Sequence, residues 1–169
     1  MCTEKADKKK FIASDIHLIV YDFDGVMTDN RVIVFQDATE AVIVNRADGL
    51  GVAHIRALDI PQLILSTETN PVVKARGEKL GLEVIQSSND KKNDLMNYCE
   101  QNDYDLQKVL YVGNDLNDLE IMKIVRFPVA PADAHSEIIK ISCLVTKAKG
   151  GEGVVRELFD IITSVKMSE

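Results

Sequence analysis

Two aspartates, Asp22 and Asp24, stand two residues apart, directly after an apolar run and directly before Gly25. Carboxylates this close repel each other unless a cation or a shared proton lies between them. Mg²⁺ meets that need, because it binds one or two carboxylates together with the oxygens of a substrate phosphate. An aspartate held there can attack phosphorus, and a second carboxylate can protonate the leaving alcohol and then deprotonate water. The pair predicts a Mg²⁺-dependent phosphatase with Asp22 as nucleophile and Asp24 as general acid and base.

Gly25 and two later positions could complete such a site. Gly25 allows a tight turn whose N–H groups face phosphate oxygens. Ser66 ends a predicted strand and could donate its hydroxyl to phosphate, although serine in this place is usually a turn residue or a helix cap. Lys91 could neutralise phosphoryl charge and bridge to Asp22, with Lys92 or an ordinary exposed lysine as the alternatives.

A cluster of acids and amides, residues 113–118, also follows an apolar strand. Asn114, Asp115 and Asp118 could complete the ligand shell of the cation. Asn and Asp also favour helix starts, so a helix cap is the other interpretation, and both can hold together. The glycine-rich residues 150–153 precede the last predicted helix and could attract an anion, but a structural turn explains them equally well.

Apolar runs alternate with amphipathic stretches along the chain. The patterns predict strands at residues 16–21, 62–65, 83–86, 109–112, 127–130 and 143–145, a hairpin of residues 32–35 and 41–44, and helices at residues 48–58, 70–80, 90–101, 116–124, 134–141 and 154–165. This alternation indicates an α/β fold with a Rossmann-like, doubly wound, mainly parallel sheet and helices on both faces. In such sheets ligands bind beyond the carboxyl ends of the strands, which is where the polar clusters fall. We expect one domain, residues 14–169, after a frayed tail of residues 1–13.

The bulk composition narrows the class of protein further. A net charge of −7 argues against a nucleic-acid partner, which would need surplus Lys and Arg. No apolar run approaches the roughly 18 residues that cross a bilayer, and the first residues lack the apolar segment of a secretory signal. We therefore expect a cytoplasmic protein without a membrane partner. Cys2, Cys99 and Cys143 show neither zinc-ligand spacing nor a disulfide framework.

Taken together, the motifs resemble those of the haloacid dehalogenase superfamily. Four stretches match its motifs in order and spacing over nearly the whole chain: DxDGxxTD at residues 22–29, Ser66, Lys91, and GNDxND at residues 113–118. The resemblance implies that Asp22 is the nucleophile and that Asp24 is the general acid and base. It also implies that the backbone carbonyl of Asp24 and a residue of the last motif are ligands of Mg²⁺.

The last motif departs from the superfamily pattern at one position. Members usually carry Asp after the Gly, where this chain has Asn114. Asn can coordinate through its carbonyl oxygen but is neutral, so metal affinity would drop unless Asp115 or Asp118 compensates. The expected metal ligands are therefore Asp22, Asp24, Asn114, Asp115 and Asp118.

The gaps between the motifs are too short for the cap domain that many superfamily members carry. An open phosphatase site would be wet and poorly selective. Capless relatives assemble, typically as tetramers in which a neighbouring subunit covers the site. We therefore expect a homotetramer, with the hairpin around Gln36 as the element of assembly.

Within the capless group the chain is similar to phosphatases of 3-deoxy-2-ulosonic acids. The supporting stretches are residues 46–51, 65–73, 150–153 and 156–157. The similarity implies a small phosphorylated sugar acid as substrate, either 3-deoxy-D-manno-octulosonate 8-phosphate or a nine-carbon, sialic-acid-type 9-phosphate. Octulosonate enzymes tend to have Arg where Glu68 stands, whereas Glu68 together with Lys79 resembles the nine-carbon branch.

This similarity also implies a set of substrate-binding residues. Glu68 and Lys79 would hydrogen-bond sugar hydroxyls or an acyl-amino group, and Arg76, with Lys74, would meet the substrate carboxylate. The whole expected set is Gly25, Arg46, Asp48, Thr67, Glu68, Arg76 and Lys79.

Two rival functions remain open. The chain could be a non-catalytic assembly domain, related to the domain fused behind acylneuraminate cytidylyltransferases, because Asn114 weakens the metal motif. It could also be a phospho-receiver domain, which surrounds Mg²⁺ with similar residues. The phosphorylated Asp of a receiver stands without an acid two residues later, so Asp24 opposes that reading.

Overall fold

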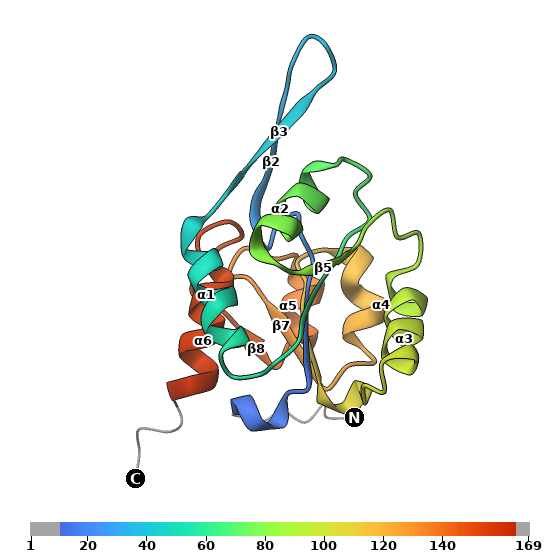
Figure 1. Cartoon of the computed structure of the whole chain (residues 1–169), viewed down its shortest axis with the longest axis vertical. Helices are drawn as coiled ribbons and strands as arrows, with labels where there is room; N and C mark the ends of the chain where they lie inside the picture. The colour runs from blue at the N-terminus through green and yellow to red at the C-terminus, as the bar shows by residue number, and fades with distance from the viewer. Residues whose placement is uncertain (1–10, 165–169) are drawn as a thin grey trace.

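The computed structural model describes residues 11–164, which form an α/β domain around a six-stranded parallel sheet (Figure 1). The strand order is β5-β4-β1-β6-β7-β8, and each pair of neighbours is parallel. The strands are β1 (Leu18–Tyr21), β4 (Gln62–Leu65), β5 (Glu83–Ile85), β6 (Val109–Val112), β7 (Phe127–Ala130) and β8 (Leu144–Val145). The predicted fold class is confirmed. Because β4 and β6 flank β1, the residues that follow these three strands emerge side by side at one edge of the sheet.

Different helices cover the two faces of the sheet. One face packs against α1 (Arg46–Arg56), α2 (Val72–Leu80) and α6 (Val154–Thr163), and the other against α3 (Lys91–Gln101), α4 (Leu119–Met122) and α5 (Ser136–Ile141). Side chains alternate along β1, so Ile19 and Tyr21 join the first core while Leu18 and Val20 join the second. Burial on both faces explains why this strand reads as a continuous apolar run.

An antiparallel hairpin of β2 (Thr28–Val34) and β3 (Glu40–Val44) projects from the body of the domain (Figure 1). Its apolar side chains are open to solvent: Val34, Phe35 and Ile43 are 64%, 52% and 57% exposed. A two-stranded ribbon alone is at best marginally stable in water, and exposed apolar surface usually marks an interaction site.

Most predicted helices begin one to three residues away from the predicted start, and two of these shifts have a visible cause. The helix predicted at residues 48–58 begins at Arg46, because the side chain of Asn45 accepts a hydrogen bond from the N–H of Ala47 at 2.9 Å. The helix predicted at residues 116–124 divides into a 3₁₀ turn, Leu116–Asp118, followed by α4. Asp115 and Asp118 cap that turn reciprocally, which favours a tight first turn.

The packed domain also starts earlier than predicted. Phe11, which was assigned to the frayed tail, is 4% exposed, and its ring centroid lies 5.0 Å from that of Phe127. Burying this ring ties residue 11 to the core, three residues before the predicted boundary at residue 14. The prediction for residues 1–10 and the predicted helix end at Val165 lie outside the described residues.

The described chain between β1 and α3 holds the hairpin, α1, β4, α2 and β5, and no cap domain. None of the helices within residues 11–164 has the length and apolar character needed to span a bilayer. Cys99 and Cys143 are free thiols.

Candidate active site

A cavity of about 270 Å³ opens beyond the carboxyl ends of β1, β4 and β6. Its lining is polar and contains Asp22, Asp24, Asn30, Ser66, Thr67, Asn114, Asp115 and Asn117. The structure thus brings together residues that the sequence separates by more than 90 positions. Asn30 and Asn117 were missed by the sequence analysis: Asn30 lies in β2, outside the motifs, and Asn117 belongs to the GNDxND motif but was given no role.

Lys91 lies beneath this cavity between two carboxylates. Its Nζ is 2.8 Å from Asp22 Oδ1 and 2.8 Å from Asp118 Oδ1, and the three side chains are 2%, 6% and 0% exposed. Burial lowers the pKa of Lys91, but the two carboxylates outweigh it, so the pKa lies above its ordinary value. Burial and then the charge of Asp118 raise the pKa of Asp22, while Lys91 opposes both. Lys91, rather than Lys92, therefore occupies the predicted place beside Asp22.

Asp118 holds Lys91 rather than facing the cavity. Its Oδ1 accepts hydrogen bonds from Lys91 and from the hydroxyl of Tyr111 at 2.7 Å, and its Oδ2 accepts the N–H of Asn114 at 2.9 Å. Both oxygens are occupied, so this placement argues against the predicted role of Asp118 as a metal ligand. Tyr111 was missed by the sequence analysis; its signal is a lone hydroxyl in the otherwise aliphatic β6.

Asp24 is half-buried at the mouth of the cavity. Its Oδ1 accepts a hydrogen bond from Thr28 Oγ1 at 3.2 Å. Burial raises the pKa of Asp24; the bond from Thr28 lowers it, and the negative charges of Glu68 and Glu40 raise it. The net shift is upward, which suits a group that must carry a proton to a leaving alcohol.

Ser66 is buried at the end of β4 and is oriented by its own loop. Its Oγ accepts the N–H of Glu68 at 3.1 Å, which leaves the hydroxyl proton free to be donated into the cavity. Thr67 is exposed and also lines the cavity. This arrangement is compatible with the predicted contact of Ser66 with phosphate.

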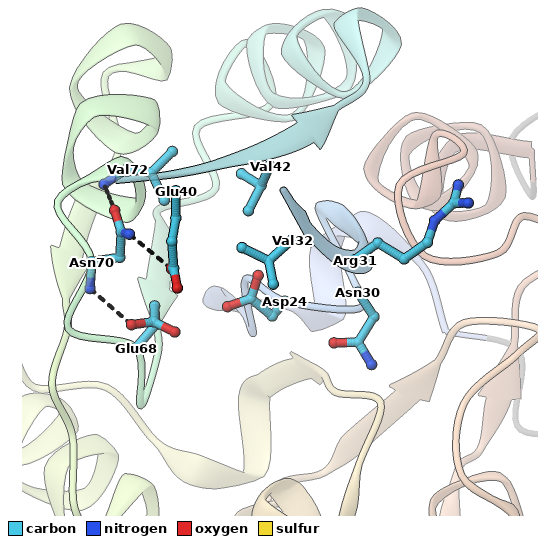
Figure 2. Close-up of a pocket in the computed structure, with 9 residues that line it drawn as sticks. All are labelled: Asp24, Asn30, Arg31, Val32, Glu40, Val42, Glu68, Asn70 and Val72. Carbon is cyan, nitrogen blue, oxygen red and sulfur yellow. Dashed lines mark hydrogen bonds between the residues drawn. The ribbon is translucent and has the colours of Figure 1, made fainter. Parts of the chain in front are cut away.

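A second cavity, of about 300 Å³, lies between Asp24 and the base of the hairpin (Figure 2). Its lining comprises Asp24, Asn30, Arg31, Val32, Glu40, Val42, Glu68, Asn70 and Val72. Glu68 accepts the N–H groups of Thr69 and Asn70 at 2.6 and 2.8 Å, and Asn70 Nδ2 donates to Glu40 at 3.0 Å. Arg31 points away from the acids (Figure 2) and pairs with Asp29 at 2.6 Å. The lining therefore offers fixed acceptors suited to hydroxyl groups.

A model of the haloacid dehalogenase-like hydrolase family matches residues 61–158, which is more than half of the 169 residues. The chain belongs to this family. Among its curated relatives, the 3-deoxy-D-manno-octulosonate 8-phosphate phosphatase KdsC of Yersinia pestis is 32% identical over 151 residues, which cover 89% of this chain and 81% of the relative.

Solved structures of the family are similar over nearly the same span. A protein of Streptomyces avermitilis MA-4680 described as a HAD family hydrolase is 43% identical with a TM-score of 0.90, covering 92% of this chain and 89% of that one. The 3-deoxy-D-manno-octulosonate 8-phosphate phosphatase of Moraxella catarrhalis, solved with magnesium, phosphate and KDO, is 28% identical with a TM-score of 0.85, covering 89% and 87%. This haloacid dehalogenase-like hydrolase is accordingly a phosphoric monoester hydrolase of the sugar-acid phosphatase type.

The donor set of this hydrolase fits a hard cation. One terminal atom of the Asn114 amide lies 3.2 Å from Asp22 Oδ2 and 2.9 Å from the carbonyl oxygen of Asp24. Oxygens on neighbouring corners of a Mg²⁺ octahedron lie about 3 Å apart, given Mg–O bonds of about 2.1 Å. No group of three or more His, Cys, Asp or Glu side chains within residues 11–164 is arranged for a metal. The candidate site differs in kind, since it combines one carboxylate, one backbone carbonyl and one amide.

Two close backbone approaches give the site its shape. Gly25 has a φ of +79°, and a Cβ there would lie 2.0 Å from Asn114 Nδ2, so a side chain would push the two loops apart. Gly150 packs on the same turn, where a Cβ would lie 2.2 Å from the carbonyl oxygen of Gly25. The glycine-rich loop thus supports the catalytic turn from behind, which favours the structural-turn interpretation.

Five predicted substrate-binding residues are absent from the linings of both cavities: Gly25, which forms the turn beside Asn114, and four residues farther away. Arg46 and Lys79 are exposed on α1 and α2, and Asp48 and Arg76 lie between helices. Asp48 is 1% exposed, and its Oδ1 accepts the N–H of Val155 at 2.9 Å at the start of α6. Arg76 Nη2 donates to the carbonyl oxygen of Asn45 at 3.0 Å. Nothing in this placement connects the four to substrate within one subunit.

Replacing Asp48 with Asn should change the pH dependence of stability. Burial raises the pKa of Asp48 from 3.8 to about 6, although hydrogen bonds from the N–H groups of Arg156 and Val155 oppose it. The folded state therefore holds the proton more tightly than the unfolded state, and wild-type stability falls as the pH rises from 3.8 to about 6. We expect the variant to gain up to about 3 kcal/mol relative to wild type between pH 4 and pH 8.

Urea unfolding of both proteins at pH 4, 5, 6 and 8 measures this difference. Parallel stability curves would contradict the buried-acid assignment. A rise in KM without any change in the free energy of unfolding would instead indicate that Asp48 binds substrate.

Proposed function

We propose that the protein is a Mg²⁺-dependent phosphatase that removes phosphate from a 3-deoxy-2-ulosonic acid through an aspartyl-phosphate intermediate on Asp22. The observation that carries the proposal is the convergence of Asp22, Asp24, Ser66 and Lys91 on one cavity at the strand ends. Similarity to octulosonate 8-phosphate phosphatases supports the substrate class.

In the first step, one carboxylate oxygen of Asp22 attacks phosphorus. The bond between phosphorus and the sugar oxygen breaks, and Asp24 gives its proton to that oxygen. In the second step, water attacks the aspartyl phosphate, Asp24 takes a proton from the water, and the carboxylate of Asp22 and inorganic phosphate are released. A bound Mg²⁺ supplies charge neutralisation to the phosphoryl oxygens, and the ammonium of Lys91 adds to it.

The residues that would hold Mg²⁺ are Asp22, the backbone carbonyl of Asp24, and Asn114. Asp115 lies exposed at the rim of the same cavity, where its side chain caps the 3₁₀ turn, so it would act on the cation only through a water molecule. In this arrangement the protein places one negative ligand on the cation.

The second cavity beside Asp24 would take the leaving sugar. Glu68 and Glu40 are fixed hydrogen-bond acceptors there, so they suit the hydroxyl or acyl-amino groups of the sugar. Glu68 favours the nine-carbon branch over the octulosonate branch, where Arg tends to stand. A nonulosonate 9-phosphate is therefore the substrate we propose first.

A screen of 8- and 9-phosphorylated ulosonic acids, with and without Mg²⁺, tests the proposal. We expect phosphate release that requires Mg²⁺ and is fastest with a 9-phosphate. Faster release from 3-deoxy-D-manno-octulosonate 8-phosphate would reject the nine-carbon substrate but keep the class of 3-deoxy-2-ulosonic acid phosphates. No release from these esters or from p-nitrophenyl phosphate would favour the rival, a non-catalytic assembly domain, to which Asn114 points.

Replacing Asp24 with Asn should slow turnover by about 10²–10⁴-fold, because an amide can neither donate the proton to the leaving alcohol nor take one from water. The decisive comparison uses two esters with leaving groups of different pKa. The loss should be larger for a sugar phosphate than for p-nitrophenyl phosphate, whose leaving group needs little protonation. Equal losses of turnover on both esters would mean that Asp24 is not the general acid.

We also propose a homotetramer in which the β2–β3 hairpin of one subunit covers the site of another. Its support is the exposed apolar side chains of Val34, Phe35 and Ile43 on a ribbon that projects from the body of the domain. Light scattering on the whole protein measures the assembly, and a monomer at micromolar concentration would refute it.

A further inference from the structure

The side chain of Asn114 is the one departure from the family motif within the proposed cation site. It is 8% exposed, and its backbone is fixed on both sides: the N–H donates to Asp118 Oδ2 at 2.9 Å, and the carbonyl accepts the N–H of His135 at 2.8 Å. Only the terminal amide is therefore free to turn.

The oxygen of this amide is a hydrogen-bond acceptor and its nitrogen is a donor, and either can occupy the same position. With its oxygen inward, three oxygens face one another: Asn114 Oδ1 lies 3.2 Å from Asp22 Oδ2 and 2.9 Å from the Asp24 carbonyl. That arrangement suits a cation, but without one it leaves acceptors facing acceptors. With the amide inverted, its nitrogen donates hydrogen bonds to both oxygens over the same distances. Buried acceptors without a donor are costly, so the metal-free protein favours the nitrogen-inward form.

Space on the far side of the amide permits the inversion. The other terminal atom of Asn114 faces Gly25, where a Cβ would lie only 2.0 Å away. Because Gly25 has none, either terminal atom has room there. The outer atom faces hydrogen-bond donors, so inverting the amide gives both of its ends a partner in the metal-free protein.

We propose that Asn114 is an amide switch: its nitrogen closes the cation site by bonding Asp22 and Asp24 in the metal-free enzyme, and its oxygen turns inward to coordinate Mg²⁺. The inference rests on the cation site of the proposed function. Mg²⁺ must displace two hydrogen bonds and gains only a neutral ligand, so the enzyme binds the cation weakly. The same two hydrogen bonds keep the site folded when the cation is absent. An aspartate at this position cannot donate those bonds, and it adds a negative ligand.

Calorimetric titration of Mg²⁺ into the whole wild-type protein and an Asn114→Asp variant tests the switch, with melting temperatures recorded beside it. The control is Asn117→Asp, which adds the same charge to the lining of the same cavity from an exposed position. We expect Asn114→Asp to lower the Kd for Mg²⁺ by about tenfold or more. Its melting temperature without metal should be lower than that of the wild type, and Mg²⁺ should raise it by more. Asn117→Asp should change the Kd by less than about threefold. Equal changes in the two variants would overturn the switch.

A second measurement uses the wild-type protein alone. The side-chain ¹⁵NH₂ signal of Asn114, assigned by its absence in an Asn114→Ser variant, should exchange slowly with solvent in the metal-free protein. Saturating Mg²⁺ should shift this signal and speed its exchange. A signal that Mg²⁺ leaves unchanged would overturn the switch even if Asn114→Asp does not fold.

The outcomes separate the switch from the proposed function. Mg²⁺ binding with the expected response of Asn114, but without phosphate release from any ester, would keep the switch and reject the phosphatase. Phosphate release with no response of Asn114 to Mg²⁺ would keep the phosphatase and reject the switch. Absence of Mg²⁺ binding in all three proteins would reject the cation site and the switch together.

Discussion

Replacing Asp22 with Asn should abolish phosphate release while leaving the fold at least as stable as in the wild type. An amide cannot form the aspartyl phosphate, and loss of the covalent nucleophile of a hydrolase lowers turnover by about 10⁴-fold or more. Stability should survive because the carboxylate of Asp22 is a buried charge that shares its only lysine with Asp118. Removing one of two competing carboxylates leaves Lys91 with a full partner.

Single-turnover phosphate release and urea unfolding on the same preparation check both halves of this expectation. Asp160→Asn is the matched control, since it makes the same change on an exposed side chain of α6 and should alter neither quantity by much. Turnover above a hundredth of the wild-type rate, in a sample free of deamidated protein, would reject Asp22 as the nucleophile. A loss of activity with a parallel loss of stability would leave the chemical role unsupported.

The positions of the catalytic groups could be predicted because they follow from topology. Residues after parallel strands emerge at one edge of the sheet, so locating the strands before Asp22, Ser66 and Asn114 already placed the three together. One helix end also followed from local sequence: α2 ends at Leu80, as predicted, because Gly81 after it adopts a left-handed conformation. Both kinds of inference need only short-range sequence patterns and one rule of sheet geometry.

The residues that were misplaced depend on long-range packing. Asp48 and Arg76 have the charges that a sugar acid would need, but the packing of α1 against α6 and α2 turns them between helices. The part played by Asp118 is of the same kind, because Lys91 and Tyr111 reach it from other elements. Residue type reveals that a group can bind a substrate or a metal, whereas only the fold decides which partner reaches it first.

Replacing Lys91 with Met should lower both turnover and stability. The ammonium of Lys91 is the only cation that contacts Asp22 and Asp118 among the ion pairs of the described residues. Its removal leaves two buried carboxylates facing each other, and breaking a buried pair in this way typically costs about 3–5 kcal/mol. Turnover should fall by about 10²–10³-fold as well, since a charge aimed at the phosphoryl group is lost. Lys92→Met, one residue along and less buried, is the control and should change stability by less than about 0.5 kcal/mol.

Combining the two substitutions distinguishes repulsion from lost packing. If the cost of Lys91→Met comes from two unpaired carboxylates, then adding Asp22→Asn removes one of them and should recover part of the stability. The two changes are in direct contact, so their effects should be non-additive by 1 kcal/mol or more, which is about the coupling expected for such neighbours. Activity should not recover, because the nucleophile is absent. Strictly additive unfolding energies would mean that Lys91 stabilises the domain through its buried methylenes, and the charge network would then serve the phosphoryl group alone.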